Sequence, residues 1–156
     1  WVLEAASGAG FDDIYLVSGA IDFENEETLN VFEHEVTIVK NHNFEDGQAT
    51  SLRAAIAVAE HDKHEAVVVG LGDMPLISSS AWAAVAEADT VLGVATFSGN
   101  RRPPVKIHHE LWPLIPLSGD EGARSLLRLR PDLVHGVPCE GNPIDIDTRG
   151  DLARWN

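Results

Sequence analysis

The stretch from Val67 to Leu76 places a carboxylate directly after a run of apolar residues. Its three consecutive valines are typical of a central strand of a parallel sheet, so Asp73 would follow the carboxyl end of that strand. Open α/β sheets bind ligands at this edge. Gly70 and Gly72 remove side chains beside the carboxylate, and Pro75 stops the strand, so we expect Asp73 on an open rim. The pattern indicates a metal or phosphate site.

A second acidic pair lies near the end of the chain. The segment Ile144–Thr148 alternates apolar and polar residues as a strand does, so Asp145 and Asp147 would point to one face. Two such charges are costly together unless a cation or solvent screens them. Mg²⁺, which is held by a few carboxylates and by substrate phosphates, would remove this conflict. A solvated edge strand, or a cap on a final helix at 149–155, remains the alternative.

A turn and a helix start between residues 41 and 53 could also bind a ligand. Asn41 follows a strand, and an Asp-Gly turn leads into a helix whose first residues we expect to be Thr50 and Ser51. Free backbone N–H groups and two hydroxyls would then face outward, an arrangement suited to a phosphate, a ribose or a base edge. Simple N-capping by Thr50 or Ser51 is the structural alternative.

Capping competes with function at two further places. Asp73 could cap the helix that follows it, although Ser78 to Ser80 lie closer to that helix. Ser118 and Glu121 have the spacing of a capping box, which predicts a helix start there. Within the same turn, Asp120 and Arg124 could also face a ligand.

A small basic segment interrupts this acidic chain at Arg101-Arg102-Pro103-Pro104. We expect an exposed loop that either meets an anionic substrate or is simply solvated. The adjacent His108 and His109 lack the i, i+4 spacing of a helical zinc pair. The chain carries no Walker P-loop, no G-x-G-x-x-G fingerprint and no G-x-S-x-G elbow.

The elements that would position these residues alternate along the chain. Leu52, Ala55, Ile56 and Ala59 have helical spacing, and Trp82, Val85 and Ala86 repeat it. Between such stretches lie six expected strands: Ile14–Val17, Val36–Val39, Ala66–Leu71, Val91–Thr96, Val105–Ile107 and Val134–Val137. The alternation predicts one α/β domain over 1–156, with a Rossmann-like, open, mostly parallel sheet and helices on both faces.

Composition restricts the partners. With 11 Lys and Arg against 25 Asp and Glu, the formal charge of −14 opposes binding to nucleic acid or to an anionic membrane surface. A small anionic ligand could still bind if a bound cation or backbone N–H groups overcame its repulsion by the acidic protein. A single cysteine, Cys139, excludes an internal disulfide framework and favours the cytoplasm. We expect its thiol to be inert.

These stretches, in order, resemble the MobA-like NTP transferases, the nucleotidyltransferase family of the molybdenum cofactor, and most closely the cytidylyltransferase branch. The resemblance covers nearly the whole chain and is carried by Asn41, Gly47–Arg53, Gly72–Leu76, Pro104-Val105, Leu111–Pro113, Ser118–Arg124, Asp145–Thr148 and Asp151-Leu152.

The resemblance implies roles for these residues. Asp73 would bind Mg²⁺, helped by Asp145 and Asp147 across the site. Gln48 to Ser51 would lie near the nucleotide. Asn41 belongs to the same motif as Gln48 to Ser51, and Gly72 belongs to the motif of Asp73. The loop from Arg102 to Val105 and the turn with Asp120 and Arg124 would line the acceptor side. The implied reaction moves an NMP from an NTP, with CTP favoured, to a phosphorylated acceptor such as the molybdopterin cofactor, and releases pyrophosphate.

The chain departs from the family in two places. The family opens with a strand and a Gly-rich loop that carries an Arg and a Lys for the triphosphate, whereas Trp1 to Ala6 resembles the helix that follows them. The cytidylyltransferase branch has a His where Pro103 stands, which leaves the acceptor open. A non-catalytic nucleotide-binding or regulatory domain, or an interaction domain with an acidic surface, is therefore the alternative to a nucleotidyltransferase.

Overall fold

The computed structural model describes residues 1–21, 23 and 36–146, whose strands form two sheets flanked by helices. The helices are α1 (Val2–Ser7), α2 (Gln48–His61), α3 (Ser79–Glu87) and α4 (Arg124–Leu129), with short 3₁₀ helices at Phe44–Asp46 and His109–Leu114. The strands are β1 (Ile14–Ser18), β2 (Val36–Lys40), β3 (Ala66–Val69), β4 (Leu92–Phe97), β5 (Asn100–His108) and β6 (Val134–Pro138). All six expected strands are confirmed, although β5 begins at Asn100 and not at Val105; the other ends shift by no more than two residues.

The two sheets differ in strand direction. β1 and β2 form a parallel pair, while the second sheet has the order β3-β5-β4-β6. In that sheet β4 and β6 are parallel, whereas β5 runs antiparallel to both of its neighbours. Parallel elements and helices thus confirm the α/β fold, and β5 adds an antiparallel strand within it.

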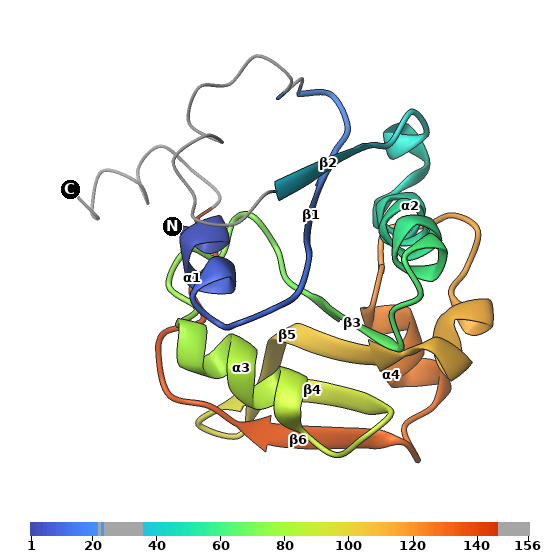
Figure 1. The fold of residues 1–156 in the computed structure, drawn as a ribbon. Helices are drawn as coiled ribbons and strands as arrows, with labels where there is room; N and C mark the ends of the chain where they lie inside the picture. Colours follow the sequence, from blue (N-terminus) through green and yellow to red (C-terminus); the bar gives the residue numbers. More distant parts are fainter. Residues whose placement is uncertain (22, 24–35, 147–156) are drawn as a thin grey trace.

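Helices cover both faces of the sheets (Figure 1). Leu52 and Ile56 of α2 pack with Leu92, Val94 and other buried residues in one apolar cluster. Trp82 and Val85 of α3 pack in a second cluster with Met74, Ala95 and Phe97. The two faces of β4 contribute to different clusters because successive side chains of a strand alternate between its faces.

The basic segment at Arg101 and Arg102 is part of β5, so the expectation of a loop there is wrong. Both arginines are exposed and pair with Thr96 and Ala95 of β4. Pro103 and Pro104 have no partner on β4, because the register shifts between Val94 and Ala95. A strand can hold prolines where no ladder hydrogen bond is required of them.

Lys106 of β5 ties the second sheet to a helix end. Its ammonium donates to the carbonyl oxygens of Ala86 and Ala88 at 2.8 and 2.7 Å, at the carboxyl end of α3. A cation is favourable at this end of a helix, where backbone carbonyls lack partners within the helix. The contact holds the carboxyl end of α3 against the sheet.

Candidate functional site

Asp73 lies in the exposed turn between β3 and α3. The N-cap of α3 is Ser78, whose hydroxyl accepts from the backbone N–H of Ala81 at 3.3 Å, so Asp73 does not cap this helix. The carbonyl of Asp73 accepts from the backbone N–H of Ile146 at 2.8 Å. This bond brings Asp73 beside Asp145, a residue 72 positions further along the sequence by the difference of their numbers.

Asp145 lies near the guanidinium group of Arg102 as well as beside Asp73. Its Oδ2 lies 3.9 Å from Nη1 of Arg102, with the two side chains 36% and 47% exposed. The residues from Ile144 to Ile146 do not form a strand, so the strand expected from their alternating pattern is wrong for these three residues. Asp147 and Thr148 lie outside the described residues.

Asn41 organises the start of α2 from the end of β2. It is 4% exposed, and its Nδ2 donates to Thr50 Oγ1 at 2.8 Å and to Ser51 Oγ at 2.9 Å. Its Oδ1 accepts from the backbone N–H of Asn43 at 3.0 Å. Neither hydroxyl caps the helix, which begins at Gln48, so the structural alternative of N-capping by Thr50 or Ser51 is wrong.

Replacing Asn41 by Ala is expected to lower the free energy of unfolding by about 2 to 3 kcal/mol, because the buried side chain loses three hydrogen bonds and its half-buried partners Thr50 and Ser51 lose their donor. Urea unfolding followed by circular dichroism measures the change. Asn43→Ala is the matched control, because Asn43 is exposed, and it should cost about 0.5 kcal/mol or less. Equal losses in the two variants would contradict the role assigned to Asn41.

The first residues of α2 contact a turn that is distant in sequence. Ala49 N–H donates to the Gly119 carbonyl at 2.8 Å, and Gly119 N–H donates to the Asp46 carbonyl at 2.8 Å. Gly47 has a φ of +101°, and a Cβ placed there would lie 2.5 Å from the Gly119 carbonyl carbon and 2.7 Å from Asp120 Oδ1. Glycine at 47 therefore allows the two segments to touch, and Gln48 and Asp120 are brought together.

The turn before α4 is not a capping box. α4 begins at Arg124 without a side-chain cap, and Glu121 forms an ion pair with Arg128 instead. Gly119 and Gly122 have φ values of +114° and +48°, which a right-handed helix does not allow. The helix therefore cannot start at Ser118.

One cavity of about 1360 Å³ joins these segments. Five of the predicted site residues line it, whereas the other described ones, Asn41, Thr50, Asp73, Asp120 and Asp145, do not. The lining predicted residues are Gln48, Ser51, Gly72, Arg102 and Arg124. Five of the chain's 11 Lys and Arg residues also line it, namely Arg101, Arg102, Lys106, Arg124 and Arg128. Basic side chains are thus gathered where an anionic ligand could enter a strongly acidic protein.

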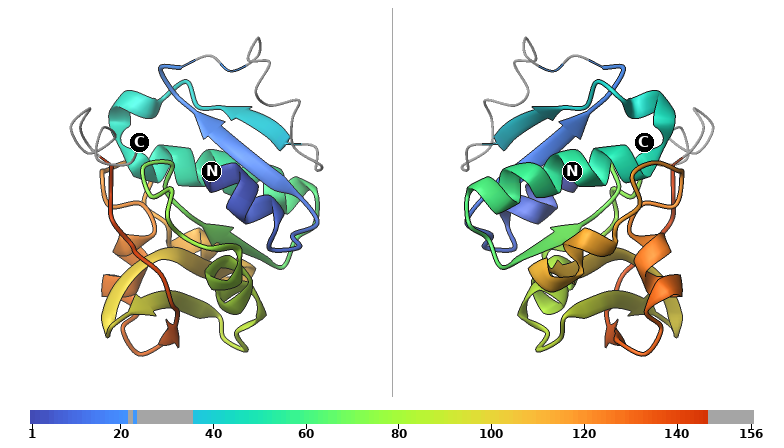
Figure 2. Two further views of the ribbon diagram at one scale, coloured as in Figure 1. Left: turned by 90° about the vertical axis from the view of Figure 1, so that its left-hand side faces the viewer. Right: turned by 90° about the vertical axis from the view of Figure 1, so that its right-hand side faces the viewer.

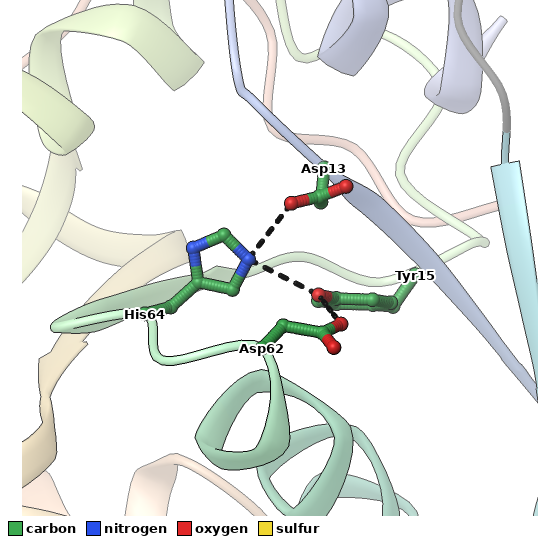
Figure 3. Close-up of polar contacts among 4 residues, drawn as sticks. All are labelled: Asp13, Tyr15, Asp62 and His64. Carbon is green, nitrogen blue, oxygen red and sulfur yellow. Dashed lines mark hydrogen bonds and ion pairs between the residues drawn. The ribbon is translucent and has the colours of Figure 1, made fainter.

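A polar cluster on β1 and the turn after α2 was not expected from the sequence (Figure 3). Tyr15 donates its hydroxyl to Asp62 Oδ2 at 2.6 Å, and His64 Nε2 lies 3.1 Å from the Tyr15 hydroxyl and 2.9 Å from Asp13 Oδ2. Burial and the bond to Asp62 raise the pKa of Tyr15, so it stays a neutral donor. Since these residues are 47 and 49 positions apart, no local spacing could have revealed them.

Comparison with known proteins agrees with this fold. A structure of Rv0371c from Mycobacterium tuberculosis has 25% identity and a TM-score of 0.78, with 98% of this chain and 80% of that chain covered. Rv0371c in complex with manganese gives 25% identity and a TM-score of 0.74, covering 97% and 82%. A nucleotidyl transferase from Methanothermobacter, at 20% identity and a TM-score of 0.76, covers 98% and 76% and shows the fold alone. No functionally curated protein matches the chain.

Family comparison gives a more specific result. The sequence profile described as the MobA-like NTP transferase domain matches residues 1–136, which include β1 to β6 up to Gly136. This range includes Asn41 and Asp73, together with the start of α2 and the turn before α4, which line the cavity. The chain therefore belongs to the MobA-like NTP transferase family, and its activity class is nucleotidyl transfer.

Proposed function

We propose that the chain transfers an NMP from an NTP, with CTP favoured, to a phosphorylated acceptor such as the molybdopterin cofactor, with Mg²⁺ and release of pyrophosphate. The observation that carries the proposal is the hydrogen bond from Ile146 N–H to the Asp73 carbonyl, because it brings two acidic residues together beside an arginine-lined cavity. The choice of CTP and of the acceptor rests on the family resemblance.

The residues present suit Mg²⁺ better than a metal that requires a complete protein cage. Among the described residues, no group of three or more His, Cys, Asp and Glu side chains could hold a metal. Mg²⁺ is commonly held by one or two carboxylates together with substrate phosphates, and Asp73 with Asp145 would supply these carboxylates. When bound, Mg²⁺ would neutralise charge on the reacting phosphates. Asp147 is proposed as a further ligand, and the manganese complex of Rv0371c supports a divalent cation.

The chain's own residues would mainly bind and orient the substrates. The backbone N–H groups of Ala49 and Thr50 are already bonded to the carbonyls of Gly119 and Gly47, so the side chains of Gln48 and Ser51, which line the cavity, would face the nucleotide. Arg102 and Arg124 would counter the negative charge of the phosphates and of the acceptor. Arg102 would also hold Asp145 in place before a cation arrives, since the two already lie 3.9 Å apart. Such positioning accounts for much of the rate in phosphoryl-group chemistry.

The proposal also includes a single domain formed by residues 1–156 and a location in the cytoplasm. Cys139 is a free thiol, and its burial raises its pKa, so it would remain protonated and inert in a reducing compartment. Across the described residues, no helix combines the length and the apolar character of a membrane span. The formal charge of −14 supports the absence of nucleic-acid and membrane partners.

The assay is pyrophosphate release by the natural full-length protein with CTP, GTP or ATP, Mg²⁺ and molybdopterin as acceptor. We expect turnover with CTP to exceed that with the other nucleotides by about tenfold in kcat/KM. The same mixture without acceptor is the control for simple hydrolysis. Equal rates with all three nucleotides would contradict the CTP assignment, and no pyrophosphate with any of them would contradict the proposed reaction.

A further inference from the structure

A groove of about 840 Å³ lies between α2 and the 3₁₀ helix at His109–Leu114, together with the short segment that follows this helix. The right-hand view of Figure 2 faces this side of the molecule, where α2 and the gold 3₁₀ helix lie next to each other. Three buried apolar residues form the floor of the groove, namely Ile56, Trp112 and Ile115. The groove therefore lies directly over the apolar core that α2 covers.

Apolar side chains that line this groove are exposed to solvent. Leu117 is 76% exposed and Leu114 is 39% exposed. Pro113 and Ala57, which line the same groove, are exposed as well. Single exposed leucines are ordinary on a protein surface, but several apolar side chains gathered beside a groove are typical of an interaction site. The groove thus has the apolar centre of a protein–protein interface.

Hydrogen bonds hold this surface in one conformation. The indole Nε1 of Trp112 donates to the Ile107 carbonyl at 3.2 Å, which fixes the 3₁₀ helix on β5. Nη1 of Arg53 donates to the Ile115 carbonyl at 3.1 Å and so joins α2 to the opposite wall of the groove. A surface that is already ordered loses little conformational entropy when it binds a partner.

The charges that line the groove are balanced, unlike those of the whole chain. With His counted as neutral, the groove is lined by two cations, Arg53 and Lys63, and by two anions, Glu60 and Glu65. The chain as a whole has a formal charge of −14, so two copies repel each other over most of their surfaces. A strongly charged partner of either sign gains little at a balanced face. A second acidic copy, in contrast, can approach there without repulsion.

The order of the charges along α2 is complementary to itself. Glu60 follows Arg53 at i+7, so the two side chains lie on one face of the helix, about two turns apart, with the small side chain of Ala57 between them. If two α2 helices pack antiparallel about a two-fold axis, Arg53 of each copy meets the partner's Glu60. Two-fold symmetry repeats this contact, so both charges of each copy are paired.

We infer that this groove binds a second copy of the chain, in a two-fold dimer centred on Ala57 of α2. Arg53 of each copy pairs with the partner's Glu60, and Leu117 of each copy covers the apolar floor of the other groove. Burial of the exposed leucines supplies the affinity, and the paired charges fix the orientation of the two copies. The inference does not depend on the proposed nucleotidyl transfer, since the groove and the cavity of the candidate site share only His64 among their lining residues.

Sedimentation equilibrium of the natural full-length protein, over about a hundredfold range of concentration, is expected to show a monomer–dimer equilibrium. Leu117→Asp should raise the dissociation constant about tenfold or more, because it places a charge over the apolar floor. Leu129→Asp is the matched control, since Leu129 is 57% exposed but lies on α4 and does not line the groove. It should leave the constant within about twofold. A monomer at every concentration, or equal effects of the two variants, would overturn the inference.

Charge reversal tests the orientation of the two copies. Arg53→Glu alone and Glu60→Arg alone each place like charges opposite one another, and each is expected to weaken the dimer about tenfold or more. When the two variants are mixed, we expect a heterodimer with a dissociation constant within about threefold of the original, because every contact then joins an acid to a base. Rescue by mixing also separates pairing from a folding defect, such as loss of the bond from Arg53 to Ile115. No rescue, or a dimer that none of these changes weakens, would overturn the inference.

Discussion

Replacing Asp73 by Asn is expected to lower kcat for nucleotidyl transfer by about 10²- to 10³-fold, the loss typical of removing one group that stabilises transition-state charge. Asn keeps the size of the side chain and removes the negative charge that would bind Mg²⁺. Pyrophosphate release at saturating nucleotide measures the change, and calorimetry with Mg²⁺ should show weaker metal binding. Because Asp73 is exposed and does not cap α3, the melting temperature should change little.

Asp89→Asn is the matched control for charge. Asp89 is also an exposed aspartate, but it lies after α3, at the other end of that helix from the turn that carries Asp73. Its replacement should leave kcat within about twofold of the unmodified protein. If Asp73→Asn behaved like Asp89→Asn, Asp73 would not be a metal ligand, although the chain would remain a member of its family.

Replacing Gly47 by Ala is expected to lower the free energy of unfolding by about 3 kcal/mol, since strained backbone and overpacking each cost roughly 1–3 kcal/mol. The new Cβ would lie 2.5 Å from backbone atoms of Gly119, at a φ of +101°. Neither segment could yield without breaking the hydrogen bonds between Gly119 and its partners Ala49 and Asp46. Urea unfolding followed by circular dichroism measures the loss.

The control for the clash is Gly99→Ala. Gly99 has a φ of +83°, so it shares the backbone strain, but a Cβ there would meet nothing within 4 Å. Its replacement should cost about 1 kcal/mol, the strain alone. The difference between the two variants isolates the contact with the Gly119 turn. Similar losses would show that backbone strain, and not the contact, determines the effect.

The sequence predicted the regular elements well because their signals are local. Runs of β-branched residues and helical spacing predicted all six strands and helices α2 and α3. It failed at β5, where two prolines suggested a loop. The prolines fit within the strand because a register shift in β4 leaves them without a partner, and only the folded sheet determines that shift. The antiparallel direction of β5 relative to β4 has a different origin: the two strands are joined by the two-residue turn Ser98-Gly99, and so short a connection permits only antiparallel strands.

The candidate site was predicted less completely than the fold. Asp73 follows its strand as expected, because the apolar run and the glycines are adjacent in sequence. The capping predictions for Thr50, Ser51 and Ser118 failed, because a hydroxyl near a helix start does not determine where the helix begins. Gly47, Gly119 and Gly122 determine it, through positive φ values and a close contact between distant segments. The glycines themselves were the signal that local pattern matching missed.

The contact between Gly47 and Gly119 also has a consequence for how the two substrates would influence each other. The start of α2 and the turn before α4 are joined by backbone hydrogen bonds on both sides of Gly119, with no side chain between them to absorb movement. Restricting either segment therefore restricts the other. A ligand that orders one segment thus lowers the entropic cost of ordering the other. Binding of a ligand at either segment then changes the affinity for a ligand at the other segment by the same factor.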